Sequence, residues 1–155
     1  MKIILGIDDS PHSHAALEWV RNMQWPQGSQ LIILSTVELY AYAMAEPGGL
    51  DVYDRVLADQ MQAREGVVAE AERELQHAGL VVSSRVMQGD PRMLIPEIAH
   101  KERADLIVVG SHGRTGLPKL IMGSVASHIL SHAPCNVLVV KHPRTPAGVK
   151  EQTRS

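Results

Sequence analysis

The residues of this chain whose types and spacing could do chemistry are concentrated between positions 105 and 127. An apolar run at 106–109 predicts a buried strand, and the loop that follows it contains Gly110, Gly113 and Gly116. The chain then enters a predicted helix at Gly123 and Ser124. Glycines let a backbone approach a ligand closely, and the first N–H groups of a helix have no partner within it. This strand, loop and helix therefore predict a site for an anion such as phosphate.

The glycine spacing differs from the common phosphate-binding motifs. No GxxxxGK[ST] occurs in the chain, and no GxGxxG follows its first apolar run. The spacing is instead Gly110-x2-Gly113-x9-Gly123-Ser124. Ser124 offers a hydroxyl and a backbone N–H at a helix start, and Arg114 either adds positive charge or faces solvent. The glycines could also do no more than form a tight connection, and the spacing alone leaves this open.

A second set of candidate ligand groups follows the first two apolar runs. Asp8 ends the first run, where its carboxylate could accept hydrogen bonds from the hydroxyls of a ribose. Ile7 precedes it, and Val37, at the end of the second run, could contact a base. The alternative is that Asp8 and Asp9 only end a strand and cap the next helix.

The apolar pattern predicts the scaffold that these segments need. Apolar runs alternate with segments of helical period, and two of the helices begin with the cap-and-proline pairs Ser10-Pro11 and Asp90-Pro91. This alternation predicts a parallel sheet with helices on both faces, in which ligands bind beyond the carboxyl ends of the strands. The predicted strands are residues 2–8, 31–37, 80–87, 106–109 and 136–140.

Two other segments are less regular. Residues 51–78 predict one long helix that ends before Gly79, and Arg64 interrupts its apolar stripe. Residues 39–50 have no clean period and contain Pro47-Gly48-Gly49. They are either a lid over the site or a packed crossover.

With its flanking segments, the glycine spacing resembles the nucleotide-binding signature G-x2-G-x9-G-[ST] of the universal stress protein family. The resemblance covers residues 2–141 and is carried by KIILGIDDSPHSHAAL, QGDP, DLIVVGSHGRTG and SHAPCNVLVVK. It implies a single α/β domain at residues 1–142, with a Rossmann-like, five-stranded parallel sheet in the order 3-2-1-4-5. Residues 143–155 are polar and predict a flexible tail.

The resemblance also implies a ligand and an assembly. The matching positions of the family contact ATP, with or without Mg²⁺, whose ligands would be mostly phosphate oxygens. Ala126 is a departure, because some members have a hydroxyl residue there that can reach phosphate. A homodimer is implied too, and Val137 to Val140 would be an apolar sheet edge that a second copy could cover. The residues matched to ATP contacts are Ile7, Asp8, Val37, Val109, Gly110, His112, Gly113, Gly123, Ser124 and Val125.

Composition argues against other classes of partner. The 155 residues carry a net charge of −2 without a Lys/Arg cluster, and aromatic residues are only 3%, which disfavours nucleic-acid binding. No apolar run approaches the ~20 residues of a membrane span, and the first run is too short for a signal peptide. The one cysteine, Cys135, cannot form an internal disulfide and reads as a small core residue, which suits a cytoplasmic protein.

No catalytic or metal site is predicted. His128 and His132 have the spacing of paired ligands, but no third ligand is near them in sequence. Ser111 and His112 are not expected to form a catalytic pair, because adjacent side chains rarely face each other. His112 and Asp8 are the only candidates near the loop to activate water, so binding with slow or no turnover is expected. Three functions stay open: an ATP-binding stress or regulatory module, a slow ATPase or nucleotide hydrolase, and a ligand-free dimeric partner.

Overall fold

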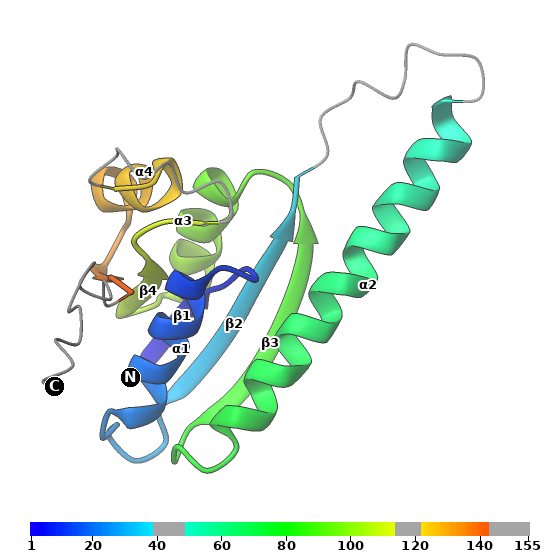
Figure 1. The fold of residues 1–155 in the computed structure, drawn as a ribbon. Helices are drawn as coiled ribbons and strands as arrows, with labels where there is room; N and C mark the ends of the chain where they lie inside the picture. The colour runs from blue at the N-terminus through cyan, green and yellow to red at the C-terminus, as the bar shows by residue number, and fades with distance from the viewer. Residues whose placement is uncertain (39–48, 114–121, 143–155) are drawn as a thin grey trace, which may run out of the picture.

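The strands form one parallel sheet in the order β3-β2-β1-β4-β5. This computed structural model describes residues 1–38, 49–113 and 122–142 (Figure 1). The α/β fold and the strand order predicted from the sequence are confirmed. The predicted tail at 143–155, Arg114, Gly116 and most of the 39–50 segment lie outside the described residues. The strands are β1 (Lys2–Gly6), β2 (Gln30–Val37), β3 (Val81–Gln88), β4 (Leu106–Gly110) and β5 (Asn136–Val140).

Helices cover both faces of this sheet. In Figure 1, α1 and α2 lie over one face, while α3 and α4 lie over the other. Alternate residues of the central strand β1 serve the two sides: Ile3 and Leu5 pack beneath α1 and α2, and Ile4 packs beneath α3 and α4. All three side chains are fully buried, as expected for the middle of a parallel sheet. The helices are α1 (Pro11–Asn22), α2 (Gly49–Leu75), α3 (Pro91–Glu102) and α4 (Ser124–His132).

The helix starts next to the strand ends are capped as the sequence predicts. The Ser10 hydroxyl accepts a hydrogen bond from the backbone N–H of Ser13 at 3.2 Å, which fixes the first turn of α1. The carboxylate of Asp90 accepts from the N–H of Arg92 at 2.8 Å at the start of α3. These caps set the direction in which each helix leaves the carboxyl edge of the sheet.

Two elements differ from their predicted bounds by two residues or more. The first strand ends at Gly6 rather than residue 8, because Asp8 turns out of the ladder and bonds to residues of the following turn. The long helix spans Gly49–Leu75 instead of 51–78. It is followed by a tight turn in which the N–H of Ala78 donates to the carbonyl of Leu75, and Gly79 adopts a φ of 71°. No helix in the described ranges is long and apolar enough to cross a membrane.

The core should respond strongly to truncation on the α3 and α4 side. Ile107 is fully buried and pairs in register with Ile4 of the neighbouring strand. Replacing Ile107→Ala should lower the free energy of unfolding by about 2–5 kcal/mol, since it leaves a cavity in a packed layer. Val81→Ala at the exposed start of the edge strand β3 is the control, with an expected change within about 0.5 kcal/mol. Denaturant unfolding measures both, and equal losses would contradict this view of the core.

Candidate functional site

A cavity of about 500 Å³ opens at the carboxyl ends of β1, β2 and β4. Nine of the ten residues predicted to contact a nucleotide line it, although they come from the two ends of the sequence. Parallel strands bring these residues together because their carboxyl ends meet at one edge of the sheet. The nine are Ile7, Asp8, Val109, Gly110, His112, Gly113, Gly123, Ser124 and Val125.

Val37 is the predicted residue that does not line this cavity. Its side chain is 3% exposed, and its carbonyl accepts a hydrogen bond from the N–H of Gly89 at 2.9 Å. Successive side chains of a strand point to opposite faces, and Val37 shares its face with Ile33, which packs beneath α1 and α2. Thr36 and Glu38 lie on the other face and line the cavity instead.

The glycines of the loop occupy places where the backbone of another segment comes very near. A Cβ atom on Gly110 would lie 2.7 Å from the carbonyl carbon of His12, and one on Gly123 would lie 3.2 Å from the carbonyl oxygen of Ser111. A Cβ on Gly113 would instead meet only a side-chain atom, Oδ2 of Asp8, at 2.9 Å. Gly110 and Gly123 therefore allow the backbones to pack, whereas Gly113 keeps space open beside Asp8.

The amino end of α4 faces the same cavity. Its N-cap is Gly123, which has no side chain to accept a hydrogen bond from the first turn. Ser124, Val125 and Ala126 of this turn all line the cavity. Free N–H groups and the positive end of the helix dipole favour an anion at such a position.

Asp8 has a structural role as well as a place in the cavity wall. Its Oδ1 atom accepts hydrogen bonds from the N–H of Ser10 at 3.0 Å and from the hydroxyl of Ser13 at 2.7 Å. Oδ2 is the atom that points toward Gly113. The two interpretations of Asp8 are thus compatible, since one oxygen orders the turn before α1 while the other faces the loop.

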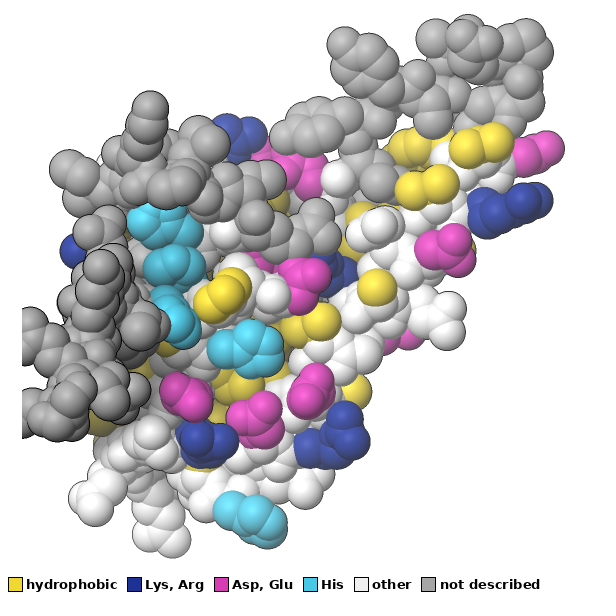
Figure 2. Space-filling model, in the orientation of Figure 1, with side chains coloured by type: hydrophobic (Ala, Val, Ile, Leu, Met, Phe, Trp, Pro, Cys, Tyr) yellow, Lys and Arg dark blue, Asp and Glu magenta, His cyan; other side chains and the backbone are white. Residues whose placement is uncertain are grey.

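The side chains of Ser111 and His112 meet, which contradicts the reason for expecting no catalytic pair there. The Ser111 hydroxyl lies 3.1 Å from Nδ1 of His112 and 3.0 Å from Nδ1 of His12. Ser111 is fully buried, and its position between two imidazoles depends on packing with α1, which sequence adjacency does not describe. Histidine side chains gather in a column on this face of the molecule (Figure 2).

Charged residues from α2 and α3 complete the wall of the cavity. Arg64, whose side chain is only 6% exposed, forms an ion pair with Asp9 at 3.2 Å. Arg92 forms an ion pair with Asp90 at 2.6 Å, and this hydrogen-bonded guanidinium holds the pKa of the carboxyl below its usual range. In the sequence, the only sign of this role is that Arg64 interrupts an apolar stripe. A buried arginine in a helix must face a partner or a polar space, so such an interruption can point to a site.

The remaining candidates for special chemistry have structural surroundings. Within the described ranges, no group of three or more His, Cys, Asp or Glu side chains is arranged to hold a metal ion. The rings of His128 and His132 stack with their centroids 4.0 Å apart. Cys135 packs against the core beneath α3 and α4, and burial raises the pKa of its thiol.

Residues 1–141 match the sequence profile of the universal stress protein family. This match spans every described strand and helix, including the whole cavity wall. The chain belongs to the universal stress protein family. Universal stress protein MJ0531 of Methanocaldococcus jannaschii is 28% identical over 144 residues, which cover 92% of this chain and 83% of that protein.

Solved structures of related proteins share the fold. The structure of hypothetical protein MJ0577 superposes with a TM-score of 0.79 at 25% identity and covers 93% of this chain and 97% of its own. A universal stress protein family member from Arabidopsis thaliana with AMP bound superposes with a TM-score of 0.62 at 19% identity, over 97% of each chain. At this lower identity the likeness concerns the fold alone.

The glycine contacts predict different outcomes for two alanine variants. Gly110→Ala should destabilise the protein by about 1–3 kcal/mol, because its Cβ would collide with the backbone of α1 and neither segment can move freely. Gly113→Ala should change stability less, since only the carboxylate of Asp8 must turn aside. Gly66→Ala in α2 is the matched control, with no atom near the added methyl group. Thermal unfolding ranks the stabilities of the three variants. A larger loss of stability in Gly113→Ala than in Gly110→Ala would refute the predicted order.

Proposed function

We propose that this universal stress protein binds an adenine nucleotide, ATP in particular, in the cavity at the carboxyl edge of the sheet. The observation that carries the proposal is the convergence of the glycine loop, the open amino end of α4 and Asp8 on one cavity. Its volume of about 500 Å³ is within the range of small-molecule sites. The AMP bound to the related Arabidopsis thaliana protein supports the same class of ligand.

The phosphates would lie against the loop and α4. Ser124 and Val125 present backbone N–H groups of the first helical turn, and the Ser124 hydroxyl is exposed beside them. Gly113 adds no side chain of its own to the space beside Oδ2 of Asp8. A Mg²⁺ ion that accompanies ATP would be held mostly by phosphate oxygens, because this part of the wall consists of backbone donors.

The sugar and base would extend toward β1 and β2. Asp8 is an acceptor beside Gly113 of the glycine loop, which suits the hydroxyls of a ribose. Beyond it the wall is mixed: Leu34 and Ile95 are apolar, whereas Glu38 and Arg64 provide an acceptor and donors. A purine needs both an apolar contact for its faces and polar groups for its edges, and this half of the cavity provides both.

The proposed role is a cytoplasmic stress-response module in which nucleotide occupancy sets the conformation or the choice of partner. Hydrolysis requires a group positioned to activate water. In the described wall, Oδ1 of Asp8 holds the turn before α1, and Nδ1 of His112 is hydrogen-bonded to Ser111. These engagements favour binding with slow or no turnover over rapid hydrolysis.

Titration with ATP and AMP tests the proposal. Both should bind the wild-type protein, and Gly113→Ala and Gly123→Val should abolish binding. The first adds a methyl group beside Asp8 in the proposed site, and the second pushes the backbone of Ser111 and His112 away from α4. Gly66→Ala should bind as the wild type does, since that methyl group points into open space. Calorimetry measures the affinities, and a phosphate-release assay on the same samples measures turnover. Absence of binding at millimolar ATP, or unchanged affinity in both loop variants, would reject the proposal.

We also propose that the protein is a homodimer paired through β5. This strand is the outer strand beside β4, and its residues Val137 to Val140 are only half-buried in the single chain. A second copy across a two-fold axis would extend the sheet and cover this apolar edge.

Light scattering tests the assembly. At micromolar concentration we expect a mass twice the 17.0 kDa of one chain, because an unpaired apolar edge strand favours association. Dilution should leave the mass unchanged until the dissociation constant is reached. A mass of one chain throughout this range would contradict the proposed dimer.

A further inference from the structure

His12 joins three segments that are far apart in the sequence. It lies in the first turn of α1, and its Nδ1 atom is 3.0 Å from the hydroxyl of Ser111, which follows β4. The same atom is 3.1 Å from the backbone nitrogen of His142, which follows β5. The hydroxyl of Ser111 also reaches Nδ1 of His112, so that one chain of hydrogen bonds runs from the end of β5 to the wall of the cavity.

The direction of these hydrogen bonds follows from their donors. The backbone N–H of His142 can only donate, so Nδ1 of His12 must be the acceptor and carries no proton. An unprotonated Nδ1 cannot donate to Ser111 either, so the serine hydroxyl donates its one proton to His12, and the two donors share the single lone pair of Nδ1. The serine oxygen then accepts from His112, whose proton is on Nδ1. His12 is therefore neutral, with its proton on Nε2, when the network is complete.

We propose that neutral His12 is a proton-sensitive latch that holds the end of β5 against the loop after β4 and so positions the nucleotide site. A proton on Nδ1 would turn the shared acceptor into a donor. The Ser111 hydroxyl can rotate and accept from it, but the N–H of His142 is fixed to the backbone and cannot. Protonation therefore breaks the hydrogen bond to His142 and releases His142 from the first turn of α1.

Ser111 transmits the state of the latch to the cavity. Its backbone N–H donates to the carbonyl of Val140 at 2.7 Å, and its carbonyl accepts from the N–H of Gly123 at 2.7 Å. One residue thus contacts His12, the end of β5 and the start of α4. The backbone of α1 leaves no space for a Cβ on Gly110, so the loop and α1 cannot shift independently. That the site reached in this way binds a nucleotide rests on the proposed function.

The surroundings of His12 place the switch on the acid side of neutrality. Burial is the largest influence and lowers its pKa, and the neighbouring His112 and His142 lower it further when they are charged. The negative charge of Asp8, which follows β1, acts in the opposite direction and raises the pKa of His12. Because the folded pKa lies below the value of 6.5 for a free histidine, neutral His12 stabilises the folded state above that value. This stabilisation is lost as the pH falls through the pKa values of the unfolded and then the folded state.

Nuclear magnetic resonance of the nucleotide-free protein tests the latch by itself. With ¹⁵N-labelled histidine, His12 should carry its proton on Nε2 at neutral pH, and the amide signal of His142 should move as His12 titrates. His12→Asn offers a carbonyl oxygen close to the position of Nδ1 and does not titrate, so it should retain the hydrogen bond and abolish the movement. A proton on Nδ1 of His12 at neutral pH would overturn the latch. So would an amide signal of His142 that stays in place while His12 titrates.

Nucleotide affinity tests the link to the cavity. Between about pH 7.5 and 5.5, the wild type should lose about three- to tenfold more affinity for ATP than His12→Asn, the effect expected for one hydrogen bond. This comparison cancels the titration of the phosphates, which is the same for both proteins. His12→Ala should have the reduced affinity at both pH values, because it has no acceptor.

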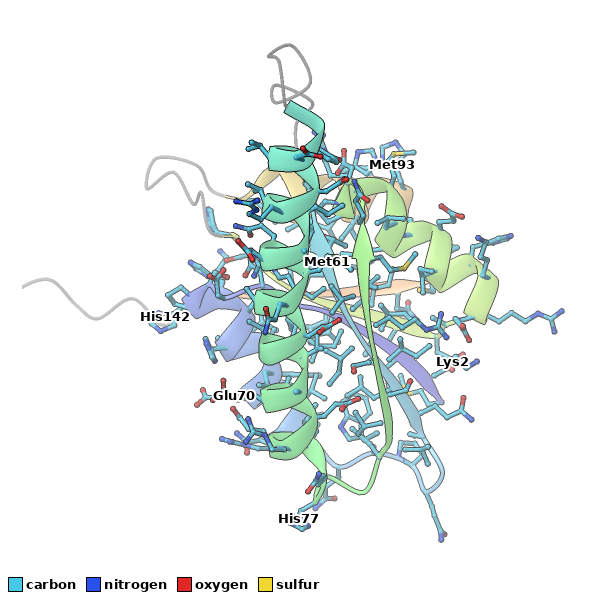
Figure 3. All side chains as sticks on the ribbon, turned by 90° about the vertical axis from the view of Figure 1, so that its right-hand side faces the viewer. Lys2, Met61, Glu70, His77, Met93 and His142 are labelled. Carbon is cyan, nitrogen blue, oxygen red and sulfur yellow. The ribbon has the colours of Figure 1, made fainter. Side chains whose placement is uncertain are left out.

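His77→Asn is the control for a histidine replaced elsewhere. His77 is exposed beyond the end of α2, away from His142 (Figure 3), and its variant should follow the wild type. Equal pH dependence in the wild type and His12→Asn would overturn the link between latch and site. If ATP binds none of the proteins at neutral pH, the proposed function and this link both fail, and the amide signal of His142 alone decides whether the latch exists.

Discussion

The close approach of β4 to the first turn of α1 is the constraint on which the rest of the site depends. Gly110 has room for no side chain, since a Cβ would lie 2.7 Å from the backbone of His12. This contact brings the Ser111 hydroxyl within 3.0 Å of His12, and Gly113 lies beside Asp8, which follows β1. A larger residue would separate the two segments and disperse the groups that converge on the cavity. The arrangement of the cavity therefore depends on the packing of the backbone at the end of β4 against the backbone of α1.

Several polar groups at this edge are held in place by the fold before any ligand arrives. One oxygen of Asp8 is engaged in the turn before α1, and Arg64 of the cavity wall is held by Asp9. Groups that are already oriented lose less conformational freedom on binding, which favours affinity for a ligand that matches them. The same engagement reduces their freedom to act as acids or bases. This balance is physically consistent with a protein that binds a nucleotide and turns it over slowly.

Much of the fold follows from local pattern, and the exceptions show where that pattern stops. Apolar runs and the caps at Ser10 and Asp90 identified the strands and helix starts, because hydrophobic period and capping are properties of neighbouring residues. Val37 belongs to the predicted strand, but which face receives its side chain depends on register within the sheet. Ser111 contacts His12, which lies ninety-nine positions away in the sequence, as well as the adjacent His112. A motif defined by the spacing of neighbouring residues cannot predict a contact between residues so far apart in the sequence.

The sequence by itself determined the order of elements, the glycine spacing and the family, and through them the edge of the sheet at which a ligand would bind. It could do so because strand and helix signals are local and parallel strands share one carboxyl edge. Only the tertiary structure decided which groups meet there: Arg64 and Glu38 in the cavity wall, and the hydrogen bonds from His142 through His12 to Ser111. These contacts join separate elements. Their distances are set by how helices pack on the sheet, which depends on the whole core at once.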